Sequence, residues 1–136
     1  LEKPEGPIAK ADLAKVKSIN LAKGEPLDYL DPCIFPYLTG VKDLFLGPGK
    51  LSDISPLRKM TRLESLRATA NQVSDISALA ELKLLDRLDL ANTLVSDISA
   101  LAGLKNLTGL HLGRTQVTDA GVKELQQALP KCQIYR

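Results

Sequence analysis

The stretch Leu85–Leu101, LDRLDLANTLVSDISAL, decides the fold because related copies of it recur along the chain. The other copies begin at Val41, Leu63 and Leu107, which gives a constant 22-residue period. A fixed period of this length is the signature of a solenoid, in which each unit buries its apolar face against its neighbours. The sequence therefore predicts an α/β solenoid in a single domain.

Each unit reads L-x-x-L-x-L, then a polar or small residue, and then V/L-S-D-I-S-x-L. This pattern resembles the bacterial leucine-rich repeats of the internalin type. The last unit, GRTQVTDAGVKELQQALPKC from Gly113, resembles the T-x-V-T-D-A-G-x-x-x-L variant of other bacterial repeat proteins. The resemblance covers roughly residues 10 to 136. It implies a right-handed superhelix with a parallel β-sheet as its concave face, short helices or extended turns on the convex face, and helical caps.

The composition suits an interior built from aliphatic ladders and excludes several functions. Leucine accounts for 26 of the 136 residues, whereas the chain holds three tyrosines, two phenylalanines and no tryptophan. The net charge is only +2, and no basic stripe interleaved with aromatics marks a nucleic-acid binder. No apolar run approaches the roughly 18 residues that a membrane span needs. We therefore expect neither a nucleic-acid partner nor a membrane span.

Four parts follow from the repeat pattern. We expect residues 1–7 to form a flexible tether and residues 8–40 an N-terminal cap with an irregular first coil. Residues 41–118 hold the 22-residue repeats, and residues 119–136 form a C-terminal helix and a closing strand.

The N-terminal part carries signals of its own. Residues 11–16 are a candidate amphipathic helix, and Val16, Ile19 and Leu21 repeat the core spacing as an irregular first strand. The offset from Val16 to Val41 exceeds the repeat period, so we expect this coil to be longer than the others. Asp31 followed by Pro32 predicts the start of a helix that runs through Phe35 and Tyr37.

At the other end, residues 119–129 show the apolar spacing of one helical face. Pro130 ends this helix. Cys132 and Ile134 are then expected to imitate Leu110 and Leu112 in the closing strand.

Side chains alternate across a strand, so the two later leucine positions of each L-x-x-L-x-L segment point into the core. The residues between them point outward and form columns across the sheet. The first column is Ser18, Asp43, Ser65, Arg87 and Gly109; the second is Asn20, Phe45, Arg67, Asp89 and His111; the third is Ala22, Gly47, Thr69, Ala91 and Gly113. The third column is nearly bare, which favours exposure of Phe45.

A hydroxyl residue followed by aspartate recurs on the convex side of every unit. The pairs are Ser52–Asp53, Ser74–Asp75, Ser96–Asp97 and Thr118–Asp119. These side chains suit the free N–H groups at the start of a helical turn. A metal site is the alternative for the four carboxylates, but no second type of ligand recurs beside them. We therefore predict capping, and no metal.

Leucine-rich repeats usually place asparagine after the strand, where its side chain satisfies backbone groups of adjacent coils. Here that column reads Gly49, Asn71, Thr93 and Thr115. Threonine can replace part of this hydrogen bonding and glycine cannot, so we expect the first full coil to be the least regular. An alternative is that Asn92 slips into the position of Thr93.

No arrangement for catalysis or for a cofactor is visible. Cys33 and Cys132 fall at opposite ends of the stack, about 20 Å apart for four coils, which is too far for a disulfide. We expect free thiols. His111 is the only histidine, and neither cysteine falls beside it. The G-P-G of residues 47–49 lacks the lysine and the helix of a phosphate loop.

Surface recognition remains as the predicted function. We expect a non-catalytic module that binds a partner protein through the concave face, as a monomer. The candidate binding residues are Phe45, Arg67, Arg87, Asp89 and His111, because aromatic and arginine side chains dominate binding hot spots. Two structural alternatives stay open. Arg67, Arg87 and Asp89 could pair as a solvated ion ladder, and the loop between Leu27 and Leu38 could cover Phe45.

Two other functions also stay open: a regulatory or substrate-docking domain of a larger enzyme, and a structural spacer. The resemblance to internalins implies a secreted or cell-surface setting. The chain itself shows no signal peptide, and that does not argue for a cytoplasmic protein because an upstream segment could have been removed.

Overall fold

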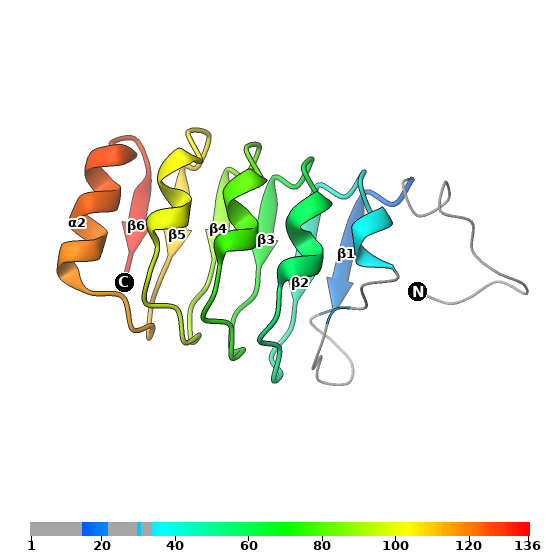
Figure 1. Ribbon diagram of the computed structural model, residues 1–136, viewed down its shortest axis with the longest axis horizontal. Coiled ribbons are helices and arrows are strands. Elements are labelled where there is room, and N and C mark those ends of the chain that lie inside the picture. Colours follow the sequence, from blue (N-terminus) through cyan, green and yellow to red (C-terminus); the bar gives the residue numbers. More distant parts are fainter. Residues whose placement is uncertain (1–14, 22–29, 31–33) are drawn as a thin grey trace, which may run out of the picture.

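The structure is a computed structural model that describes residues 15–21, 30 and 34–136. Successive coils stack along one axis, with strands on one side and short helices on the other (Figure 1). The six strands are β1 Ser18–Leu21, β2 Asp43–Leu46, β3 Ser65–Arg67, β4 Arg87–Asp89, β5 Gly109–His111 and β6 Gln133–Tyr135. The helices are η1 Phe35–Tyr37, η2 Ser55–Lys59, η3 Ser77–Glu81, η4 Ser99–Gly103 and α2 Asp119–Ala128.

All strands are parallel and lie in sequence order, and the described sheet is open at both edges. Leu44 pairs with Leu66, Leu66 with Leu88, and Leu88 with Leu110. This register confirms the 22-residue alignment. Ile19 pairs with Leu44, which confirms that the first coil is longer than the later ones.

The core is a set of aliphatic ladders between the sheet and the convex helices. Leu44, Leu66, Leu88 and Leu110 have at most 2% of their surface exposed, as predicted for inward strand positions. The isoleucine and leucine of each S-D-I-S-x-L segment are also buried. Because each leucine is covered by the coils on both sides, stability depends on stacking rather than on any single repeat.

The predicted capping aspartates are confirmed on the convex side. Asp53, Asp75 and Asp97 each accept a hydrogen bond of 2.9 Å from the backbone N–H two residues later, where a 3-10 helix begins. In the last unit, Thr118 takes this role and its hydroxyl accepts the N–H of Gly121. A group of three or more potential metal ligands does not occur within the described ranges.

The residues of the asparagine column bond to backbone groups in the turn after each strand. Asn71 is buried, and its side chain accepts the Leu51 N–H at 3.2 Å and donates to the Gly47 carbonyl at 3.1 Å. It therefore joins its own coil to the preceding one. Thr93 donates only to Leu90 within the same coil, at 2.6 Å. The prediction that threonine replaces part of the bonding is confirmed.

The residue before this column adopts a left-handed backbone in three coils. Ala70, Asn92 and Arg114 have φ values of 56°, 58° and 56°. Pro48 stands at the same place in the first repeat, and its ring fixes φ at about −65°, so that turn differs as expected. Asn92 is exposed while Thr93 is buried, so the alternative in which Asn92 takes the ladder position is wrong.

The C-terminal coil differs from the prediction in the register of its strand. The predicted helix is confirmed as α2, but Ile134 pairs with Leu110, a position that the sequence pattern assigns to Cys132. The ten-residue helix α2 replaces a five-residue 3-10 helix, so this coil is longer than the one before it and β6 shifts accordingly. Arg136 closes the coil with an ion pair to Asp119 and a hydrogen bond to the Val117 carbonyl.

At the N-terminal end only part of the prediction can be compared. A helical turn passes through Phe35 and Tyr37 as predicted, as a 3-10 helix of three residues, and Phe35 is buried. The candidate helix of residues 11–16 lies almost entirely outside the described residues, as do Asp31, Pro32 and Cys33. Cys132 is a free, buried thiol, and burial raises its pKa.

Candidate recognition surface

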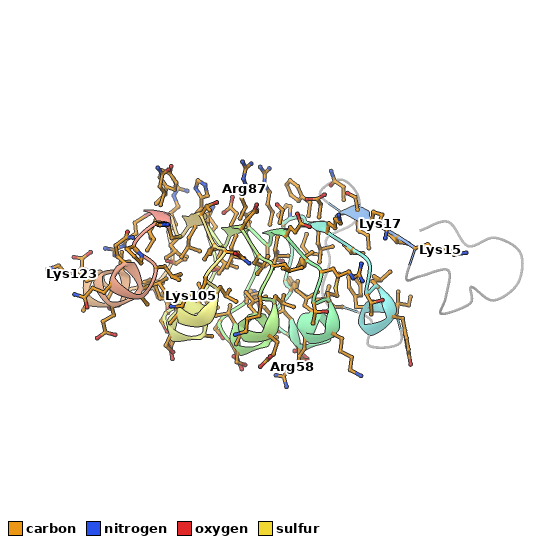
Figure 2. All side chains as sticks on the ribbon, turned by 90° about the horizontal axis from the view of Figure 1, so that it is seen from above. Lys15, Lys17, Arg58, Arg87, Lys105 and Lys123 are labelled. Atoms are coloured by element: carbon orange, nitrogen blue, oxygen red, sulfur yellow. The ribbon has the colours of Figure 1, made fainter. Side chains whose placement is uncertain are left out.

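The outward side chains of the strands form one continuous surface, which we call the sheet face. Strand pairing aligns Asn20, Phe45, Arg67, Asp89, His111 and Tyr135 in its central column. Ser18, Asp43, Ser65, Arg87, Gly109 and Gln133 form the adjacent column. In Figure 2, Arg87 extends away from the sheet, whereas Arg58 extends from the opposite, helical side. All five predicted binding residues therefore lie on the sheet face.

Phe45 and Arg67 form a pair on β2 and β3. The guanidinium carbon of Arg67 lies 5.3 Å from the centroid of the Phe45 ring, within the range of a cation–π contact. Phe45 is half-buried and Arg67 is exposed. The contact holds a flexible arginine over a fixed ring, so the pair presents a preorganised surface.

A stacked aromatic pair lies at the other end of the same column. The rings of His111 and Tyr135 are stacked, with centroids 4.6 Å apart and an angle of 13° between their planes. The Tyr135 hydroxyl donates a 2.6 Å hydrogen bond to the side-chain oxygen of Gln133. The sequence interpretation did not place Tyr135 beside His111, because the expected closing strand was two residues out of register.

The charged residues that the structure describes on the sheet face form no ion pairs with one another. Among the described residues, Arg67, Arg87 and Asp89 share no ion pair, so the predicted alternative of an ion ladder is wrong. One carboxylate oxygen of Asp89 instead accepts the backbone N–H of Ala91 at 3.1 Å. The second alternative, a loop covering Phe45, concerns residues 27–38, half of which lie outside the described ranges.

A hollow of about 520 Å³ opens on the sheet face over β3 to β6. Gly109 forms part of its floor, and a Cβ atom added there would meet no heavy atom within 4 Å. The walls are formed mainly by Arg67, Arg87, Asp89, His111, Lys131 and Tyr135. Four of the five predicted binding residues thus surround one hollow, while Phe45 stands outside it.

The convex side offers acidic groups but no comparable chemistry. The backbone N–H groups of Ser55, Ser77 and Ser99 lower the pKa of Asp53, Asp75 and Asp97 respectively, so these carboxylates serve the turns. Over the residues that the structure describes, no helix is long and apolar enough to cross a membrane.

Solved structures of bacterial proteins share this architecture. Internalin C2 of Listeria monocytogenes matches with a TM-score of 0.83 at 27% identity, over 94% of this chain and 54% of that chain. The internalin inlF of Listeria monocytogenes matches with a TM-score of 0.72 at 25% identity, over 92% of this chain and 42% of that chain. These matches confirm the predicted internalin-like repeats and the solenoid fold.

A leucine-rich-repeat protein of Leptospira interrogans shares the fold, with a TM-score of 0.70 at 18% identity over 92% of this chain and 38% of that chain. The present chain spans about half the length of the first of these proteins and less of the other two. No family model matches the sequence, and a search of curated proteins gives no significant match. The shared fold supports a role in protein interaction in general.

Proposed function

This chain has an internalin-like leucine-rich-repeat fold, and we propose that it is a non-catalytic module that binds a partner protein through its sheet face. The binding residues in this proposal are Phe45, Arg67, Arg87, Asp89 and His111. A secreted or cell-surface setting is part of the same proposal, by analogy with the internalin likeness.

One observation carries the proposal: a cation–π pair, a stacked aromatic pair and arginines that form no ion pair with a described residue share a single face, and all of them except Phe45 line one hollow. Aromatic and arginine side chains contribute most of the free energy at protein interfaces, especially where they are held in place before binding. The convex side instead carries short polar side chains that cap its turns.

A photo-crosslinking experiment tests the choice of face. The photoreactive residue p-benzoylphenylalanine is placed at Arg87 on the sheet face or at Lys59 on the convex side, both of which are exposed. The two proteins are irradiated in extracts of the source cells and of cells that they contact. We expect a discrete protein adduct from position 87 that is absent from position 59.

The opposite pattern would contradict the proposal, because adducts confined to position 59 would place the partner on the convex side. Adducts from neither position would favour the alternative of a structural spacer. An adduct with a catalytic domain of the same polypeptide would favour a docking or regulatory role within a larger enzyme.

A further inference from the structure

We propose that the hollow over Gly109 receives a carboxylate side chain from an acidic segment of the partner protein. This inference rests on the proposed function and makes it more specific, because it names the chemistry that the sheet face would recognise. Gly109, which has no side chain, lies in the middle of a column of polar residues on the sheet face.

Gly109 interrupts the column that contains Arg87 and Gln133. Strand pairing places Arg87 on one side of Gly109 and Gln133 on the other, so their backbones are about 10 Å apart at two strand spacings. No heavy atom lies within 4 Å of the position that a Cβ atom of residue 109 would take. A partner side chain can therefore approach the backbone of β5 between two long polar residues.

The walls of the hollow are rich in hydrogen-bond donors. Arg87 and Lys131 are exposed cations that form no ion pair with any described residue. The side-chain oxygen of Gln133 accepts the Tyr135 hydroxyl, so its amide nitrogen remains as a donor for a ligand.

Asp89 is the one carboxylate in the wall of the hollow, and it does not balance the positive charge of the cations there. One of its oxygens is held by the backbone N–H of Ala91. With Arg67, Arg87 and Lys131 in the same wall, the cations outnumber the carboxylate three to one. A guanidinium binds a carboxylate through two parallel hydrogen bonds, so an acidic side chain complements the hollow in both charge and hydrogen bonding.

The stacked rings of His111 and Tyr135 indicate which type of residue would lie next to the acidic residue in the partner protein. Tyr135 is 48% exposed although its ring is fixed by stacking on His111 and by its bond to Gln133. A flat and immobilised aromatic surface beside a donor-rich hollow favours an acidic residue followed by an apolar one. A nucleic acid is disfavoured, because the cations gather at one hollow and do not follow a stripe that could track a phosphate backbone.

The experiment uses the full chain and a displayed library of random twelve-residue peptides. Selections are run against the unchanged protein and against two variants at one position, Gly109→Tyr, which fills the hollow, and Gly109→Ala, which leaves most of it open. Both substitutions find space for a Cβ atom, and φ at residue 109 lies outside the left-handed region. Tyrosine is also a good strand former, so thermal melts should show that both variants fold.

We expect the selected peptides to be enriched in Asp and Glu next to apolar residues. A synthetic peptide with the selected sequence should bind Gly109→Tyr and Arg87→Ala at least about tenfold more weakly, the size of effect that loss of an anchor contact produces. Gly109→Ala and the convex variant Arg58→Ala should bind it as the unchanged protein does. Replacing its Asp and Glu residues by Asn and Gln should weaken binding to a similar extent.

Four outcomes would overturn the inference, and the first three leave the proposed face and its protein partner intact. Selected peptides without acidic enrichment would reject the carboxylate, and acidic peptides that bind Gly109→Tyr normally would reject the hollow. Failure to select any peptide would reject a linear acidic segment as the ligand. A twelve-nucleotide thymidine oligomer provides a competitor. If it displaces the bound peptide at a lower concentration than unlabelled peptide does, the ligand of the hollow is a nucleic acid and not a protein. The proposed function fails separately, in the crosslinking experiment.

Discussion

The guanidinium carbon of Arg67 on β3 lies 5.3 Å from the centroid of the Phe45 ring on β2. Both residues belong to the central column of the sheet face, one coil apart. The contact couples their effects on stability, and because the Arg67 side chain is exposed, the contact is expected to contribute about 0.5–1 kcal/mol.

A double-mutant cycle measures this coupling. We expect Phe45→Ala and Arg67→Ala to show a coupling free energy of about 0.5–1 kcal/mol in denaturant unfolding. The matched cycle of Phe45→Ala with Arg87→Ala should give a coupling free energy close to zero. A large loss of stability from Phe45→Ala alone would instead identify Phe45 as a residue covered by the cap.

The same two substitutions should weaken partner binding. Once a partner has been isolated, Phe45→Ala and Arg67→Ala should each reduce its affinity by more than about 1 kcal/mol, as anchor residues do. Calorimetry with the exposed convex variants Lys59→Ala and Glu81→Ala provides the control, and these should bind normally. A loss confined to the convex pair would contradict binding through the sheet face.

Adjacent positions on β4 test the alternation of the strand. Leu88 is 1% exposed and Arg87 is exposed. Leu88→Ala should lower the free energy of unfolding by about 2–5 kcal/mol, the range for truncation of a buried leucine. Arg87→Ala should lower it by about 0.5 kcal/mol or less. Equal losses in denaturant melts would mean that the strand register is wrong by one residue.

Asn71 should contribute more to stability than its size suggests. Asn71→Ala leaves the Leu51 N–H and the Gly47 carbonyl without their partner, and each buried unsatisfied group costs about 1–3 kcal/mol. Asn71→Thr should fall between Asn71→Ala and the unchanged protein, because a threonine hydroxyl can bond within its own coil, as Thr93 does. Equal melting temperatures for Asn71→Ala and the unchanged protein would show that these groups find other partners.

The convex aspartates predict a dependence of stability on pH. The Ser77 N–H lowers the pKa of Asp75 in the folded state. The contribution of the Asp75 carboxylate to the free energy of unfolding is therefore complete above its pKa in the unfolded state, about 4. It is lost as the pH falls through the lower pKa of the folded state. The difference in unfolding free energy between the unchanged protein and Asp75→Ala should be constant from pH 7 to pH 5 and should shrink below pH 4. Asp75→Asn keeps a hydrogen-bond acceptor but carries no charge. The difference in unfolding free energy between Asp75→Asn and Asp75→Ala should therefore not change with pH.

The repeats made most of the fold predictable. Leu66, Leu88 and Leu110 follow one another at the same offset, so their inward direction and pairing could be read from the sequence alone. The candidate residues on β2 to β5 followed from the same alternation. Their actual role in binding remains a prediction.

The closing strand was not predictable from the period. Helix length sets the length of a coil: the period places Cys132 opposite Leu110, whereas the ten-residue α2 lengthens the last coil and brings Ile134 there. The error hid the stacking of Tyr135 on His111, and with it one wall of the hollow. The hollow depends on which neighbouring side chains leave space unfilled, and the repeat pattern alone does not give the packing of those side chains.

The left-handed turns after the strands have a consequence for the evolution of this chain. Repeats beginning at Leu63 and Leu85 share one turn geometry, with Ala70 and Asn92 at almost the same φ. Duplication or deletion of such a unit would keep this turn geometry at the new junction and would change the width of the sheet face by one strand, about 4.8 Å. The unit beginning at Val41, which lies between β1 and β3, could not supply that turn, because the ring of Pro48 excludes a left-handed backbone. A change of length that keeps one turn geometry therefore requires units from the part of the chain after Pro48.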